Sequence, residues 1–157
     1  GFATQRDGTI SFNEATFAAP GGQLIRLLEA STFSPSQRAP GETSRLGWFE
    51  EIALPVDNVE TARQFWERLG FVPAEESEEP FPHIGLTSDS LDVALVGSSA
   101  LSRPALLFTD QAMPKRIGAL ADAGIEFARR LPGKLDPARH ALLVAPEGTQ
   151  LLLATAE

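Results

Sequence analysis

Apolar and polar residues follow one another along this chain in two periods, and the order of the periods repeats. ALPVDNVETARQFWERLGF (Ala53–Phe71) begins with a short apolar run and continues with apolar residues spaced three and four apart. This pattern predicts a strand followed by an amphipathic helix. LLFTDQAMPKRIGALADAGI (Leu106–Ile125) repeats it, and Gly70 and Gly124 stand where a glycine ends a helix.

Three short apolar runs follow each predicted helix, and their two-residue alternation is typical of half-buried strands. The expected strands are residues 71–74, 83–87, 91–96, 125–129, 140–145 and 149–154. The predicted fold class is therefore α+β, with a strand–helix–strand–strand–strand module (βαβββ) that occurs twice in a complete domain at residues 48–157.

The two ends of the chain share one phrase. FAAPGGQLIRLLEA (17–30) and LVAPEGTQLLLATA (143–156) both place Pro and Gly between apolar runs, which predicts a turn between two strands. We interpret residues 1–30 as the last three strands of a partial upstream module whose first strand and helix are absent from this sequence. Either a longer parent protein or a partner chain is expected to supply them. Residues 31–47, rich in Pro, Ser and Gly, are predicted to be a linker. Strands without a covering helix need a partner surface, so we expect a homodimer or another association through residues 1–30.

Composition narrows the choice of partners and compartment. The formal net charge of -8 argues against a nucleic-acid partner, because such a chain gains nothing from counterion release. No apolar run approaches the ~20 residues that span a bilayer, so no membrane partner is expected. The absence of cysteine excludes disulfides and thiolate metal sites, and a cytoplasmic location is the expectation.

Three phrases, in their order and spacing, resemble the vicinal oxygen chelate superfamily, which contains glyoxalase I, extradiol dioxygenases and the bleomycin- and fosfomycin-resistance proteins. They are EIALPVDNVETARQFWERLGF, PALLF with AMPKRIGALADAGIEF, and APEGTQLLL. The resemblance implies paired modules that form curved mixed sheets around a cleft. In metal-using members, the first and fourth strands of each module supply four ligands, usually His or Glu.

The four matching positions in this chain are Glu51, Ala94, Ala105 and Leu152. One carboxylate and three hydrocarbon side chains cannot repay the dehydration of a divalent ion. We therefore expect no metal and no other cofactor. A divalent metal held with ligands from an upstream module is the alternative.

Strand alternation selects the side chains expected to face the cleft. Glu51 is the candidate catalytic residue, because a carboxylate among apolar neighbours has a raised pKa and serves as a general base. The alternative is a solvated carboxylate or one paired with an arginine. The two histidines could bind a ligand or transfer protons, or could simply lie near solvent at strand ends. The predicted ligand-binding residues are His83, Asp92, Leu107, His140, Leu142, Gln150 and Leu152.

Three functions remain open from the sequence. The first is a metal-free protein of the glyoxalase and bleomycin-resistance type that binds a small apolar or aromatic molecule in a mainly apolar cleft. The second is a lyase, isomerase or dioxygenase of the same superfamily that uses a metal or Glu51 as general base. The third is a non-catalytic domain retained for assembly in a larger protein.

Overall fold

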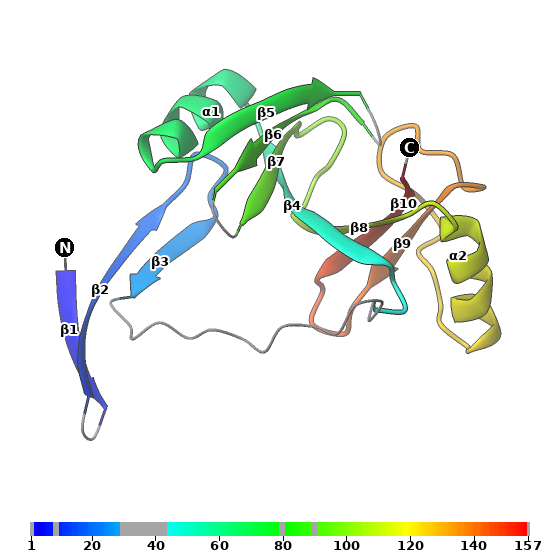
Figure 1. Ribbon diagram of the computed structural model, residues 1–157, viewed down its shortest axis with the longest axis horizontal. Helices are drawn as coiled ribbons and strands as arrows, with labels where there is room; N and C mark the ends of the chain where they lie inside the picture. Colours follow the sequence, from blue (N-terminus) through cyan, green and yellow to red (C-terminus); the bar gives the residue numbers. More distant parts are fainter. Residues whose placement is uncertain (1, 8–9, 29–43, 79–80, 89–90, 157) are drawn as a thin grey trace. The chain divides into compact units, whose positions relative to one another are not determined.

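The computed structural model describes residues 2–7, 10–28, 44–78, 81–88 and 91–156. The chain divides into two units, Gly1–Glu42 and Thr43–Glu157 (Figure 1). Most of the predicted linker, up to residue 43, lies outside the described residues. Its last residues are described, and Ser44 and Gly47 form an isolated antiparallel bridge just before the first strand of the second unit.

The first unit is a three-stranded antiparallel sheet in the order β1-β2-β3. Its strands are β1 (Phe2–Asp7), β2 (Ile10–Ala18) and β3 (Leu24–Leu28). Three strands were expected in this part of the chain. That they complete a module with a segment outside this sequence stays a prediction.

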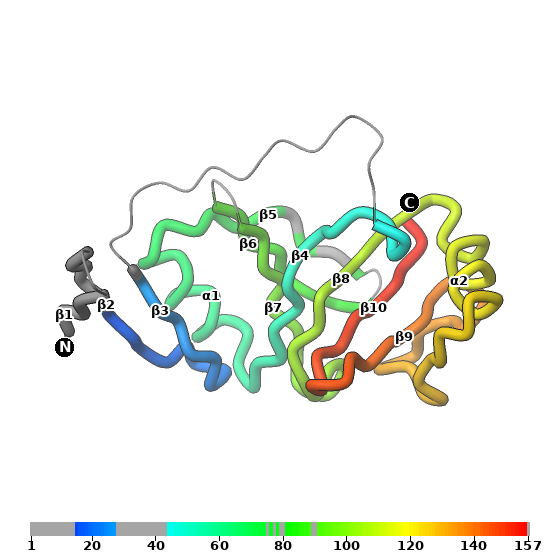
Figure 2. The backbone as a smooth tube through the Cα atoms, turned by 90° about the horizontal axis from the view of Figure 1, so that it is seen from below, coloured from blue at the N-terminus to red at the C-terminus, as the bar shows by residue number. Residues whose placement is uncertain are grey.

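The second unit is built on a seven-stranded mixed sheet in the order β5-β6-β7-β4-β8-β10-β9. We call β4, α1, β5, β6 and β7 the first module, and β8, α2, β9 and β10 the second module. β4 runs parallel to β7 and antiparallel to β8, so the two modules meet at the β4–β8 pair in the middle of the sheet (Figure 2). The elements are β4 (Trp48–Val56), α1 (Val59–Arg68), β5 (Val72–Ser77), β6 (His83–Thr87), β7 (Asp92–Gly97), β8 (Ala105–Asp110), α2 (Met113–Asp122), β9 (His140–Val144) and β10 (Gln150–Thr155).

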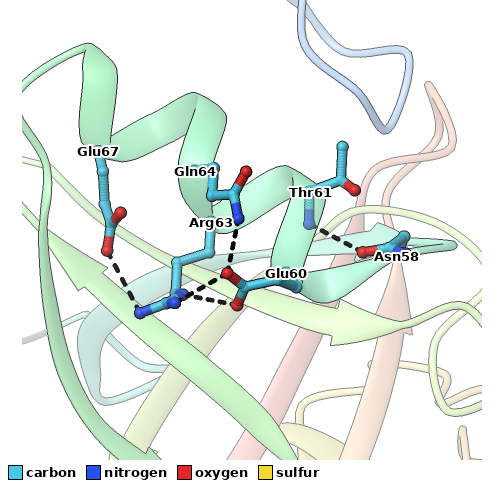
Figure 3. Close-up of polar contacts among 6 residues, drawn as sticks. All are labelled: Asn58, Glu60, Thr61, Arg63, Gln64 and Glu67. Carbon is cyan, nitrogen blue, oxygen red and sulfur yellow. Dashed lines mark hydrogen bonds and ion pairs between the residues drawn. The ribbon is translucent and has the colours of Figure 1, made fainter.

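The first helix is fixed at its start and along its exposed side by local side chains. Asn58 caps α1, because its Oδ1 accepts a hydrogen bond of 2.8 Å from the Thr61 N–H. One turn further on, Arg63 donates to both carboxylate oxygens of Glu60 at 2.9 Å (Figure 3). The opposite side of the helix buries Trp66, which anchors α1 to the sheet. α1 packs against β5, β6 and β7, whereas α2 packs against β9 and β10.

The shared phrase at the two ends of the chain forms the same turn twice. The N–H groups of Ala19 and Ala145 each donate to the carbonyl four residues on, at 2.8 and 2.9 Å. Gly22 and Gly148 donate back to the carbonyls of these alanines, at 2.9 and 2.8 Å. Both glycines have positive φ, +81° and +92°, which explains why glycine follows the Ala-Pro pair by the same interval in each copy.

One predicted strand is wrong. Residues 125–129 do not form a strand, and one backbone hydrogen bond, from the Ala128 N–H to the Leu142 carbonyl at 2.8 Å, joins this segment to β9. The chain turns away because Leu131 and Leu135 pack onto the sheet face instead of continuing along its edge. Pro132, between them, has no N–H to donate to a ladder. β9 is therefore the edge strand of the second module.

The sheet of the second unit buries both of its faces. On the helix-covered face, Leu143 and Leu153 pack with Met113 and Leu120 of α2. On the opposite face, which we call the loop-covered face, strand residues cluster under side chains from the connecting segments. The strand residues of that face are Ala53, Ala94, Val96, Ala105, Leu107, Leu142, Leu152 and Ala154, and the covering residues are Phe81, Leu101 and Leu135.

Candidate functional site

A row of small side chains crosses the loop-covered face. The strand registers place Gly85 beside Ala94, Ala94 beside Ala53, Ala53 beside Ala105, and Ala105 beside Gln150. The three alanines are 0–1% exposed. Because these side chains are short, larger side chains from the flanking positions have room to reach toward one another above the row.

Glu51 and His83 meet across this row. Glu51 lies on β4 one position before the row, and His83 lies at the start of β6, beside Val96 of β7. Glu51 Oε1 is 3.5 Å from His83 Nε2, and the two side chains are 11% and 10% exposed. The sequence assigned each residue to this side of the sheet by strand alternation but did not predict that they form a pair.

The backbone fixes the orientation and the tautomer of His83. Its Nδ1 lies 2.8 Å from the Phe81 carbonyl oxygen. Since a carbonyl oxygen only accepts, Nδ1 carries the hydrogen and donates it. In the neutral imidazole, Nε2 is then an acceptor that faces the carboxyl group of Glu51. The two side chains therefore face each other through Oε1 and Nε2, 3.5 Å apart.

Burial raises the pKa of Glu51 above its ordinary value, and desolvation is the largest cause. The nearby imidazole of His83 acts in the opposite direction and lowers the pKa. The negative charges of Glu50 and Asp92 raise it further. Glu51 is therefore not a solvated carboxylate, and none of the described arginines pairs with it. Asp92, although exposed, acts on the pKa of Glu51 through its charge.

His140 occupies a separate place. Its side chain is buried, with 6% of the residue exposed, and its Nδ1 donates to the Asp136 carbonyl at 3.0 Å. β6 and β9 are five strands apart in the sheet order, about 24 Å at the usual strand spacing. The fold therefore does not bring His140 to the Glu51–His83 pair. Both imidazoles nevertheless donate Nδ1–H to the backbone just before their strands.

The remaining predicted residues lie on the loop-covered face. Leu107, Leu142 and Leu152 form one row of buried side chains across β8, β10 and β9. Gln150, on β10, has a buried Oε1 without a hydrogen-bond partner among the described residues. A buried acceptor left unpaired costs about 1–3 kcal/mol, so a donor from a bound molecule would be stabilised there. That these four side chains contact a ligand stays a prediction.

Comparisons with known proteins agree with the resemblance read from the sequence. No protein-family model and no curated protein matches the chain. Among solved structures, a homoprotocatechuate 2,3-dioxygenase variant from B. fuscum matches with a TM-score of 0.57 and 16% identity, covering 100% of this chain and 48% of the dioxygenase. A catechol 2,3-dioxygenase matches with a TM-score of 0.53 and 15% identity, covering 100% and 60%. The chain therefore spans about half to three fifths of the length of these dioxygenases.

A shorter structure matches as well. It is described as a NAD-dependent benzaldehyde dehydrogenase from Legionella pneumophila, and the match has a TM-score of 0.55 and 16% identity over 68% of this chain and 97% of that one. The chain therefore shares the fold of these solved structures. The α+β prediction is confirmed, with two helices on a mixed seven-stranded sheet.

Of the four positions that the sequence resemblance matched to metal ligands, only Glu51 carries a donor atom in its side chain. Three of the four, Ala94, Ala105 and Leu152, have hydrocarbon side chains, and all three are buried in the apolar cluster. Within the described ranges, no three His, Cys, Asp or Glu side chains lie close enough together to hold an ion. Glu51 and His83 alone are too few donors for a divalent cation.

The helices that the structure describes include none with the length and apolar character of a membrane-spanning segment.

Sequence reasoning missed the residues that cover the site. Phe81, Leu101 and Leu135 come from connecting segments, and each is buried over the strand residues. The signal was present as single large apolar residues inside otherwise polar or Pro-containing stretches such as EEPFPH and RLPGKL. Such residues carry no period, so periodicity could not assign them to a face.

Proposed function

We propose that this protein binds a small aromatic molecule on the loop-covered face without a metal, and that the Glu51–His83 pair and Gln150 orient it. The observation that supports the proposal is a buried pair of ionisable side chains, 3.5 Å apart, beside a row of glycine and alanine in an apolar layer. Burying ionisable groups costs free energy unless they are paired with each other or hydrogen-bonded to a bound molecule. The small row is the part of the face with the least side-chain volume.

The polar groups define what the molecule has to carry. Gln150 is two strands from Ala53 along the row, about 10 Å at the usual spacing. The alanines are 0–1% exposed, so covering side chains have to move before a flat ring of that reach can lie on them. It would then donate a hydrogen bond to Gln150 Oε1 at one end and approach Glu51 at the other. Phe81, whose ring centroid is 6.3 Å from that of His83, would then border the ring.

A titration with 4-nitrophenol and its methyl ether, 4-nitroanisole, tests this proposal. The phenol can donate a hydrogen bond and the ether cannot, and the visible absorption of the phenol reports its ionisation. We expect the phenol to bind about tenfold more tightly, because a buried acceptor that is left unpaired weakens the complex. In two-dimensional NMR spectra, the backbone N–H signals that shift on binding should belong mainly to residues 52–54, 93–95 and 105–107.

Matched variants of the two polar ends sharpen the test. Gln150→Leu should remove the preference for the phenol while still allowing the ether to bind. Glu51→Gln should lower the affinity for the phenol and change the fraction of bound phenol that is ionised. Equal affinities for phenol and ether in the wild type, or shifts confined to other parts of the chain, would argue against this site.

Proton transfer is the second candidate function. The observation that favours it is the arrangement of Glu51 and His83, in which the Phe81 carbonyl fixes the tautomer and burial raises the pKa of the carboxyl group. A carboxyl with a raised pKa is a stronger base than an ordinary one, as a general base near neutral pH requires. A bound substrate with an acidic C–H would lose its proton to Glu51. Activity that falls in both Glu51→Gln and His83→Gln, with a changed pH profile, would distinguish catalysis from binding alone.

Association through the first unit is proposed separately. Leu24 and Leu27 of β3 are 77% and 54% exposed, which is unusual for two leucines of one short strand. Strand alternation places the two leucines on opposite faces of the small sheet, so a homodimer through one face would cover one of them. Sedimentation at increasing concentration should detect the dimer, and Leu24→Lys together with Leu27→Lys should shift it to monomer.

A further inference from the structure

We propose that the second module carries a separate binding site for an organic anion with an apolar body. The site is a pocket at the β9 edge of the sheet, where the second module lacks the strand that would correspond to β5. It goes beyond the function proposed above, because neither Glu51 nor His83 lines it.

The pocket exists because the chain leaves the sheet. In the first module, β5 pairs along β6. In the second, the segment after α2 makes its backbone contact through Ala128 and then passes over the loop-covered face. The space left between this segment, α2 and the start of β9 has a volume of about 460 Å³, within the range of ordinary small-molecule sites.

The lining of the pocket combines an apolar wall with cationic groups. Ile117, Phe127 and Leu131 contribute apolar surface, and Arg129 and Arg130 line the same space. Neither arginine makes an ion pair or a side-chain hydrogen bond within the described parts of the chain. An apolar wall beside two unpaired guanidinium groups suits a flat molecule that carries a carboxylate.

His140 adds a directional group to this pocket. Because its Nδ1 donates to the Asp136 carbonyl, Nε2 is the ring nitrogen left for a bound molecule. This nitrogen has no protein partner among the residues that the structure describes. In the neutral imidazole this nitrogen is an acceptor, so it would accept a hydrogen bond from a donor group on the body of the bound molecule, while the arginines face the carboxylate.

The net charge of the segment that forms the pocket is opposite in sign to that of the whole chain. Residues 126–140 contain four basic side chains and two acidic ones, a net charge of +2, whereas the chain carries -8. In so acidic a protein, a local positive region draws anions to this edge and away from the rest of the surface. The contrast makes the pocket selective for negative charge.

Binding of 2-naphthoate, with neutral 2-naphthamide as the matched probe, tests the proposal on the full chain. Two-dimensional NMR should show saturable shifts at residues 127–131 and 140–141, with 2-naphthoate at least about tenfold tighter than the amide. Arg129→Gln combined with Arg130→Gln should weaken 2-naphthoate about tenfold or more and leave the amide nearly unchanged. Backbone N–H signals of this variant that match those of the wild type outside residues 127–131 and 140–141 would show that the variant is folded.

Lys134→Gln combined with Arg139→Gln is the control, because it removes two positive charges from the same segment without touching the lining. It should change 2-naphthoate affinity less than about twofold. An equal loss of affinity for 2-naphthoate in the two double variants would mean that positive charge anywhere in the segment attracts the anion, and it would overturn the proposed site. So would shifts confined to the Glu51–His83 region, or the absence of saturable shifts with 2-naphthoate. Glu51→Gln should leave 2-naphthoate binding unchanged, which separates this result from that of the first site.

Discussion

The two modules of the second unit start from the same strand–helix plan and end with different edges. In the first module, β5 completes the sheet, and the interior of the loop-covered face holds the Glu51–His83 pair. In the second, the corresponding segment crosses the face, and the sheet stops at β9 beside a pocket with two arginines. The two modules therefore share the arrangement of their central strands and differ at their edges, and the pocket with two arginines lies where they differ.

The two helices also differ in how their first turns are stabilised. α1 has an Asn58 cap and an ionic network on its exposed side, whereas α2 begins after Ala112, which makes no side-chain capping bond, with Pro114 in its first turn. α1 is anchored by one large buried side chain, Trp66, and α2 by two, Met113 and Leu120. The first helix thus depends on both local and tertiary contacts, and the second mainly on packing.

The largest expected effect is at these anchors. Trp66→Ala should lower the free energy of unfolding by about 3–5 kcal/mol, because Trp66 is 6% exposed and its ring meets that of Phe71 with centroids 4.9 Å apart. Leu120→Ala removes less buried area and should cost about 2–3 kcal/mol. Urea unfolding followed by circular dichroism measures both. A larger loss from Leu120→Ala would reverse the ranking of the two modules.

The buried pair gives the next largest effect. His83→Ala leaves Glu51 buried without its partner and should cost about 1–3 kcal/mol at neutral pH. Glu51→Gln should cost less, since an amide can still face Nε2 without a charge. Its stability relative to wild type should also depend on pH.

The direction of that pH dependence follows from the raised pKa of Glu51. Protonation stabilises the folded state when the folded pKa exceeds the unfolded one, and this contribution is fully present below the unfolded pKa. It is lost as pH rises through the folded pKa. Glu51→Gln should therefore gain stability relative to wild type as pH rises above the ordinary pKa of a glutamate, measured by tryptophan fluorescence in urea. Parallel curves for wild type and Glu51→Gln would contradict the raised pKa.

The smallest expected effect tests the helix starts. Asn58→Ala should cost about 1 kcal/mol, since it removes the acceptor for the Thr61 N–H. Ala112→Ser should gain a few tenths of a kcal/mol at most, because the backbone at Ala112 is not in the extended conformation of a good cap. Thermal unfolding of both variants measures the contrast. A neutral Asn58→Ala would show that α1, like α2, depends on packing alone.

Much of the fold could be predicted because its signals are local. Helix periodicity, the glycines after each helix and the repeated Ala-Pro turns depend on residues a few positions apart. The assignment of Glu51, His83 and Leu152 to one side of the sheet needed only strand alternation, and the registers agree with it. The strand predicted at 125–129 failed because the burial of Leu131 and Leu135 on another face outweighed a weak local pattern.

The sequence by itself determined the order of strands and helices, the turns and the face on which each strand residue lies, because chain geometry sets these over short distances. Only the tertiary structure decided which distant groups meet: that Glu51 reaches His83 over a row of alanines, that Phe81, Leu101 and Leu135 cover that face, and that Arg129 and His140 line one pocket. Such meetings depend on sheet order and on competition for burial, which no local pattern encodes.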